Sequence, residues 1–200
     1  MQIKKHQNEE PIPDFVLWQN YKDGDIDSLS ELMRRYYMSL LQYGTKFTKN
    51  KMLIEDILHD LFLELLDRRA FISNPESVKN YLFKAFRINL NKAIHKNNLM
   101  IGIKEQEEDI FAELKTIEHA ILDEDSEKEI VAKLNQYFGL LTKRQKEALH
   151  LKYYESLSHD EISAVMDINK QSVSNLLQQA IGILKKSWFA YLVLFKLFSS

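Results

Sequence analysis

Apolar side chains recur every three to four residues over four stretches of the N-terminal half, 15–21, 29–43, 53–66 and 78–94. This spacing places the apolar residues on one face and predicts amphipathic helices. Asp27 or Ser28 is expected to cap the second helix. Asn74 should cap the fourth, with Pro75 at its first position and an end near Lys96.

Two short motifs mark helix starts in the C-terminal half. Thr142 precedes Gln145 by three residues, and Ser158 precedes Glu161 in the same way. In such a capping box, the hydroxyl accepts from the N–H three residues on, and the Gln or Glu side chain reaches back.

A turn at residues 166–168 follows the second capping box. Asn169 is expected to cap a longer helix that ends near Lys186. A short helix, a tight turn and a longer capped helix predict a helix-turn-helix. Its inward side chains are expected to be Ile162, Val165, Val173, Leu177, Ala180 and Leu184.

Composition narrows the class of protein. The chain has 200 residues, with 5 Gly, 3 Pro and no Cys. Few chain breakers argue against a turn-rich β fold, and the missing thiols exclude disulfides, thiolate zinc sites and a Cys nucleophile. We expect no signal peptide, no membrane span and a cytoplasmic protein.

Charge is distributed in blocks beneath a net charge of −2. Residues 68–104 carry 8 basic and 1 acidic side chains, and residues 105–129 carry 2 basic and 11 acidic ones. This alternation indicates nucleic-acid-facing surfaces joined by a solvated connector. The alternative is that these blocks are simply exposed helical faces without a partner. Charge alone does not favour either interpretation.

The third predicted helix has an acidic face opposite its apolar stripe. That face either contacts only solvent or docks on a basic surface, and the second reading is favoured. Glu55 and His59 are one turn apart and could bind a metal, but no partner motif completes a site. The candidate docking residues are Glu55, Asp56, His59, Asp60 and Glu64.

Two further surfaces are candidates for DNA. Basic residues can track phosphates, and aromatic faces can stack unpaired bases; the candidates near the fourth helix are Phe71, Tyr81, Lys84, Arg87, Asn91, Lys92, His95 and Lys96. Asn and Gln can bond adenine, and Ser can bond bases or phosphate; the candidates in the last helix are Lys170, Gln171, Ser172, Ser174, Asn175 and Gln178.

Four segments together resemble bacterial RNA polymerase sigma factors of the extracytoplasmic-function (ECF) type. They are LWQNYKDGD at 17–25, IEDILHDLFLEL at 54–65, YLFKAFRINL at 81–90, and LTKRQ at 141–145 with LSHDEIS at 157–163. The resemblance implies docking of the acidic helix on the coiled-coil of the largest polymerase subunit. It also implies −10 recognition and melting by the fourth helix, and −35 recognition by the helix-turn-helix.

The chain departs from the family pattern at particular positions. His59 stands where Gln is usual, and Asp167 where Gly is usual. The last helix has fewer basic residues than most members, which predicts weak intrinsic −35 binding.

We therefore expect an all-α protein with two small helical domains, 14–98 and 129–186, joined by an acidic linker, 99–128. A flexible N-terminus (1–13) and an apolar tail (187–200) flank them. The expected partners are core RNA polymerase, promoter DNA and an anti-sigma factor, with no cofactor, metal or small-molecule substrate. The alternatives are a helix-turn-helix regulator that works without polymerase and, more remotely, a helical metal enzyme. We also expect the acidic segment 105–129 to mask the basic surfaces.

Overall fold

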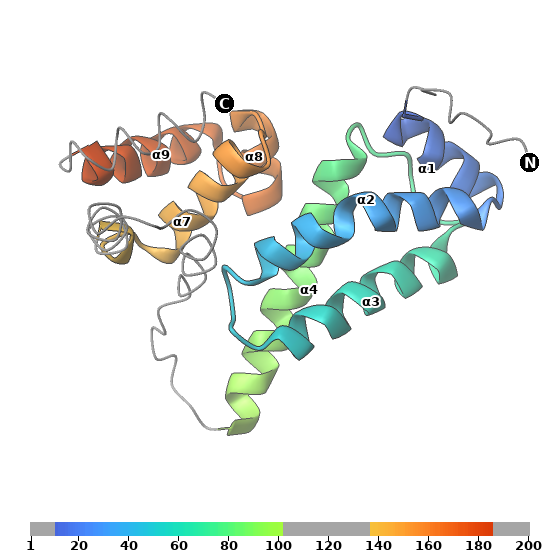
Figure 1. Cartoon of the computed structure of the whole chain (residues 1–200), viewed down its shortest axis with the longest axis horizontal. Coiled ribbons are helices and arrows are strands. Elements are labelled where there is room, and N and C mark those ends of the chain that lie inside the picture. Colours follow the sequence, from blue (N-terminus) through green and yellow to red (C-terminus); the bar gives the residue numbers. More distant parts are fainter. Residues whose placement is uncertain (1–10, 102–136, 186–200) are drawn as a thin grey trace, which may run out of the picture.

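The computed structural model describes residues 11–101 and 137–185, and all regular elements in these ranges are helical (Figure 1). The prediction of an all-α fold is confirmed. The expected linker from 102 onward, most of the N-terminal segment and the apolar tail lie outside the described residues. The N-terminal half contains α1 (Asp14–Asp23), α2 (Ile26–Gly44), α3 (Lys51–Arg68) and α4 (Val78–Ile101).

The second half is smaller and begins with α7 (Lys143–Leu149), which continues into a π-helical turn, η2 (His150–Tyr154). The helix-turn-helix follows as α8 (His159–Met166) and α9 (Lys170–Lys185). None of the helices within the described residues is long and apolar enough to cross a membrane.

Both predicted capping boxes are confirmed. Gln145 N–H donates to Thr142 Oγ1 at 3.3 Å, and the Gln145 side chain accepts from Thr142 N–H at 2.9 Å. At the start of α8, Glu161 N–H donates to Ser158 Oγ at 3.2 Å, and the Glu161 carboxylate accepts from Ser158 N–H at 2.8 Å. Each box therefore satisfies two N–H groups that a helix start leaves without partners.

The predicted cap of α2 is wrong by two to three residues. Asp25 is the N-cap, and its carboxylate accepts from Asp27 N–H at 3.1 Å and from Ser28 Oγ at 2.6 Å. The shift arises because Gly24 ends α1 in the left-handed conformation, with φ of 114°. The next residue is then free to cap α2.

The start of α4 is also later than predicted. The helix begins at Val78, and Ser77 Oγ accepts from Asn80 N–H at 3.2 Å. Ser77 thus does the capping that the sequence assigned to Asn74, and Pro75 lies before the helix. At its other end α4 extends beyond the expected Lys96 to Ile101.

The core of the first half lies between α1, α2, α3 and α4. Trp18 and Tyr21 are fully buried, and the Trp18 ring meets Tyr81 of α4 edge to face at 5.2 Å. The Tyr21 hydroxyl donates to the Leu65 carbonyl of α3. Burial raises the pKa of Tyr21 to about 12, so this hydroxyl remains a donor at neutral pH.

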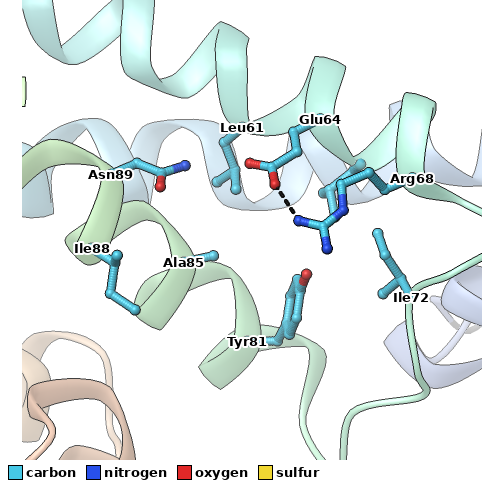
Figure 2. Close-up of a pocket in the computed structure, with 9 residues that line it drawn as sticks. Leu61, Glu64, Arg68, Ile72, Tyr81, Ala85, Ile88 and Asn89 are labelled. Carbon is cyan, nitrogen blue, oxygen red and sulfur yellow. Dashed lines mark hydrogen bonds and ion pairs between the residues drawn. The ribbon is translucent and has the colours of Figure 1, made fainter. Parts of the chain in front are cut away.

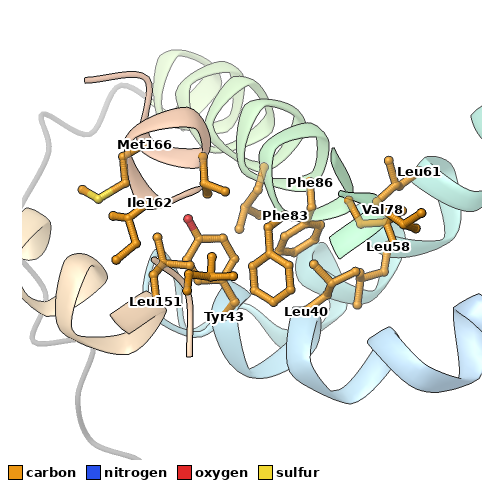
Figure 3. Close-up of a cluster of buried hydrophobic side chains, with 14 of the residues drawn as sticks. Leu40, Tyr43, Leu58, Leu61, Val78, Phe83, Phe86, Leu151, Ile162 and Met166 are labelled. Carbon is orange, nitrogen blue, oxygen red and sulfur yellow. The ribbon is translucent and has the colours of Figure 1, made fainter. Parts of the chain in front are cut away.

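The two halves share one apolar core. Figure 3 shows Phe83 and Phe86 of α4 next to Tyr43 of α2, with Leu151 and Ile162 of the second half against them. All five side chains are fully buried. Because α8 also packs on α4, the second half covers one side of that helix. The sequence patterns did not predict this contact.

Candidate functional site

The acidic face of α3 is open to solvent. Asp56, His59, Asp60 and Glu64 are exposed, and Glu55 is half-buried. The spacing of α3 therefore turns its buried residues inward and leaves these five side chains on the outer side.

Two ion pairs within α3 engage the ends of this face. Glu64 Oε1 lies 2.6 Å from Arg68 Nη1, and Glu55 Oε1 lies 3.7 Å from Lys51 Nζ. Such exposed pairs contribute only about 0–1 kcal/mol. A docking partner could therefore replace them at little cost.

Two apolar residues share the acidic face and were missed by the sequence analysis. Met52 is 74% exposed and Leu63 is 58% exposed. They lie four residues before Asp56 and three residues after Asp60, which places them in the same stripe. Leu63 had a signal in the sequence, since it falls outside the apolar register that runs through Leu61, Phe62 and Leu65.

The metal alternative gains no support from this face. Within residues 11–101 and 137–185, no three His, Cys, Asp or Glu side chains converge as a metal site would require. The His59 ring instead lies near Tyr37, with their centroids 6.4 Å apart.

Most of the predicted −10 surface lies along one exposed side of α4. The exposed side chains are Lys84, Asn91, Lys92, His95 and Lys96. Phe71, in the loop before α4, is 85% exposed. A large aromatic side chain in that position contributes little to the core and is available for stacking.

A cavity of about 190 Å³ opens between α3 and α4 beside this surface. Figure 2 shows Glu64 and Arg68 paired above the Tyr81 hydroxyl, with Asn89 further along α4. Tyr81, which is half-buried, lines this cavity and is the member of the predicted −10 surface that is reached through it. Burial raises the pKa of Tyr81, so its hydroxyl is a hydrogen-bond donor at neutral pH.

Arg87 does not lie on the open surface with its neighbours. Its side chain is only 14% exposed, and Nε donates to Glu147 Oε1 at 2.6 Å. Its assignment to DNA stays a prediction, and in this structure its guanidinium contacts a carboxylate of the second half.

The helix-turn-helix has the predicted geometry. Asp167 adopts the left-handed conformation at φ of 54°, and Ser163 Oγ donates to the Ile168 carbonyl at 2.7 Å. Asn169 Oδ1 accepts from Ser172 N–H at 2.7 Å and so caps α9 as expected. The six side chains predicted to point inward are all buried.

The outer side of α9 carries the predicted −35 residues. Gln171, Asn175 and Gln178 are exposed, and Ser172 and Ser174 are half-buried. Gln171 Nε2 donates to Asn175 Oδ1 at 3.1 Å, which aligns the two amides on adjacent turns. Lys170 Nζ lies 2.8 Å from Asp160, an exposed pair that a phosphate could replace.

Two sequence comparisons show what the chain is similar to. Residues 131–183 match the family described as Sigma-70, region 4. The chain is 26% identical over 162 residues to the ECF RNA polymerase sigma factor SigM of Bacillus subtilis (strain 168), covering 79% of this chain and 93% of that protein.

Two solved structures share the fold. CnrH, solved in complex with the cytosolic domain of CnrY, superposes with a TM-score of 0.59 at 14% identity, covering 86% of this chain and 95% of that one. The sigma factor RpoE from Bartonella quintana, solved with the anti-sigma factor NepR, gives 0.58 at 14% identity, covering 78% and 94%. The region 4 match and the similarity to SigM show that the chain resembles sigma factors of the ECF type, and the two solved structures share its helical fold.

Proposed function

We propose that this sigma factor acts as a dissociable subunit that docks on core RNA polymerase and directs it to promoters. One observation supports this most strongly. α3 has an open face on which Asp56 and Asp60 lie between two exposed apolar residues, Met52 and Leu63. Apolar anchors surrounded by charges are typical of protein interfaces.

In this proposal the exposed basic side of α4, with Phe71, holds the −10 strand once it is unpaired. The amides of α9 read the −35 element in the major groove. The sigma family is not a family of enzymes, and we propose that this chain likewise positions DNA for a reaction that the polymerase catalyses. Its place of action would be the cytoplasm.

We further propose an anti-sigma factor as a partner. RpoE was solved with an anti-sigma factor, and CnrH with the cytosolic domain of CnrY.

Core binding tests the docking assignment. We expect Asp56→Lys with Asp60→Lys to weaken binding to core polymerase by at least about tenfold, because close charge pairs across interfaces commonly couple by more than about 1.4 kcal/mol. Fluorescence anisotropy with labelled protein measures this affinity. Both carboxylates are exposed, so the fold should be unaffected.

A matched control carries the same change of net charge elsewhere. Asp23→Lys with Glu76→Lys alters two exposed acids outside α3 and should leave core binding intact. Equal affinities for the two double variants would refute docking through α3. If promoter-specific transcript starts also appear without this protein, or if it binds promoters equally well without polymerase, the alternative of an independent regulator would hold.

A further inference from the structure

Glu147 connects the two halves of the molecule through a buried carboxylate. The Tyr43 hydroxyl of α2 donates to Glu147 Oε1 at 2.6 Å, and Arg87 Nε of α4 donates to the same oxygen at 2.6 Å. Arg87 Nη2 lies 3.5 Å from Oε2. Glu147 is 4% exposed, so α7 places a charge in the contact between the halves and two donors from the first half satisfy it.

A second ion pair crosses the same contact. Lys79 Nζ of α4 lies 2.9 Å from Glu155 Oε2, and it also donates to the Glu155 main-chain carbonyl at 2.7 Å. Glu155 is 4% exposed. Two cations of α4, Lys79 and Arg87, lie about two turns apart, and each is matched by a buried carboxylate from the second half.

Aromatic packing fixes the position of the contact. The His150 ring stacks on Tyr43 with centroids 5.8 Å apart and planes inclined by 16°, and on its other side it stacks on Tyr154 at 5.1 Å. Tyr43 is also part of the shared apolar core (Figure 3). A contact with paired buried charges and an apolar core has one preferred register, unlike a loose encounter between two domains.

Arg87 lies between exposed members of the predicted −10 surface. Lys84 and Asn91 are exposed one turn before and after it. The forked N–H donors of a guanidinium can bind either a carboxylate or a phosphate. Glu147 therefore pairs with the Arg87 guanidinium, which a DNA phosphate would have to contact at the centre of this surface.

We infer that the free protein rests in a closed state in which Glu147 holds Arg87 away from DNA, and that opening of the halves releases it. The masking step rests on the proposed function, whereas the closed state stands on the contacts alone. The acidic face of α3 and the amides of α9 are exposed in the closed state. Polymerase can therefore dock before the halves separate, and opening becomes a later step.

This device differs from masking by the acidic segment 105–129, which lies outside the described residues. Masking by that segment would use many weak charges that salt screens. The Glu147 contact uses one buried carboxylate, which salt screens much less. A single neutral substitution at residue 147 should therefore open the molecule while the segment remains unchanged.

The experiment measures closure directly by energy transfer between two dyes. The chain has no Cys, so Gln19→Cys in α1 and Ala164→Cys in α8 place labels only at two exposed positions, one in each half. In this labelled full-length chain, Glu147→Gln keeps the size of the side chain and removes its charge. We expect the transfer efficiency to fall and to become broadly distributed.

Two further variants make the result specific. Glu31→Gln removes an acid that pairs only within α2, with Arg34 and Arg35, and should leave the transfer efficiency unchanged. The exchange Arg87→Glu with Glu147→Arg restores an ion pair of opposite polarity and should restore the efficiency. If Glu147→Gln fails to fold by circular dichroism, Glu155→Gln tests the second pair in the same way.

A fluorescent thymidine oligonucleotide then reports whether closure masks DNA binding. Affinity should rise in Glu147→Gln but not in Glu31→Gln, by about tenfold if about one tenth of the unaltered molecules are open, since apparent affinity scales with the competent fraction. Unchanged transfer efficiency in a folded Glu147→Gln variant overturns the closed state. Lost transfer with equal oligonucleotide affinity in the two variants overturns the masking. If no variant binds the oligonucleotide, the proposed DNA-binding function fails, and the transfer measurement still decides the closed state.

Discussion

Gly44 and Ile54 approach so closely that a Cβ on Gly44 would lie 2.6 Å from Ile54 Cγ2. The same Cβ would lie 3.1 Å from Phe86 Cζ. We expect Gly44→Ala to lower the free energy of unfolding by about 1–3 kcal/mol, because neighbouring core side chains must leave their preferred rotamers. Urea denaturation followed by circular dichroism measures this change.

Gly182 is the matched control for that substitution. It also lies within a helix, α9, but a Cβ there would meet nothing within 4 Å. Gly182→Ala should raise the free energy of unfolding by up to about 1 kcal/mol through helix propensity. Equal effects of the two substitutions would contradict the close packing at Gly44.

The turn of the helix-turn-helix gives a second stability prediction. Asp167 has φ of 54° and ψ of 52°, where a β-branched residue is strained by about 1–2 kcal/mol. We expect Asp167→Val to destabilise the protein by about that amount. Asp167→Asn, which tolerates the left-handed region, should be nearly neutral. A Val variant as stable as the Asn variant in urea denaturation would show that the turn does not require this conformation.

The exposed bases of α4 predict a change in salt dependence. Lys84→Ala with Lys92→Ala should reduce the slope of log affinity against log salt for single-stranded DNA by about 0.7 per lost phosphate contact. The measurement is oligonucleotide binding over a range of salt concentrations, with permanganate footprinting for promoter melting. Lys22→Ala with Lys49→Ala, outside α4, should leave the slope unchanged. If both pairs alter the slope alike, the effect reflects net charge and not the α4 surface.

His150 predicts a pH dependence of closure. Burial lowers its pKa, which outweighs the nearby Glu155 carboxylate that raises it, and Lys46 and Lys79 lower it further. The stacked Tyr43 and Tyr154 complete its surroundings. Opening the halves exposes the imidazole and returns its pKa toward the ordinary value of 6.5. The open form then binds protons more readily, so closure should weaken as the pH falls below 6.5.

Energy transfer in the labelled chain, followed from about pH 8 to about pH 5.5, measures this effect near the His range. His150→Phe keeps a stacked ring without a titrating group and should remove the change. Glu155 acts in a lower range: although burial raises its pKa, His150 and Lys79 lower it below 4.5 overall. Its stabilising charge is therefore lost only at more acid pH. A pH response that persists in His150→Phe would assign it to another group.

The sequence predicted what is local and missed what is long-range. The capping boxes at Thr142 and Ser158 involve residues only three apart, so the sequence predicts them directly, and the structure confirms both. The start of α4 was misplaced because Asn74 and Ser77 are both competent caps, and packing decides between them. The Tyr43–Glu147 hydrogen bond joins residues 104 positions apart. Helical spacing in the sequence does not predict a partner so far along the chain. Glu is also a residue type that is usually exposed on a helix, so nothing in the sequence marks Glu147 as buried.

The shared carboxylate of Glu147 limits how freely the halves of this protein can be exchanged with those of related proteins. A chimera that joins this N-terminal half to a foreign C-terminal half inherits Tyr43 and Arg87 together with the surface shaped to meet Glu147. Where the foreign half has an apolar residue at the equivalent position, closure would bury a guanidinium without its anion, which is strongly unfavourable. Such a chimera would stay open. An exchange of whole domains, made to change promoter specificity, would then also change the closed state of the free protein. The foreign half would need a carboxylate at the position of Glu147 to preserve that state.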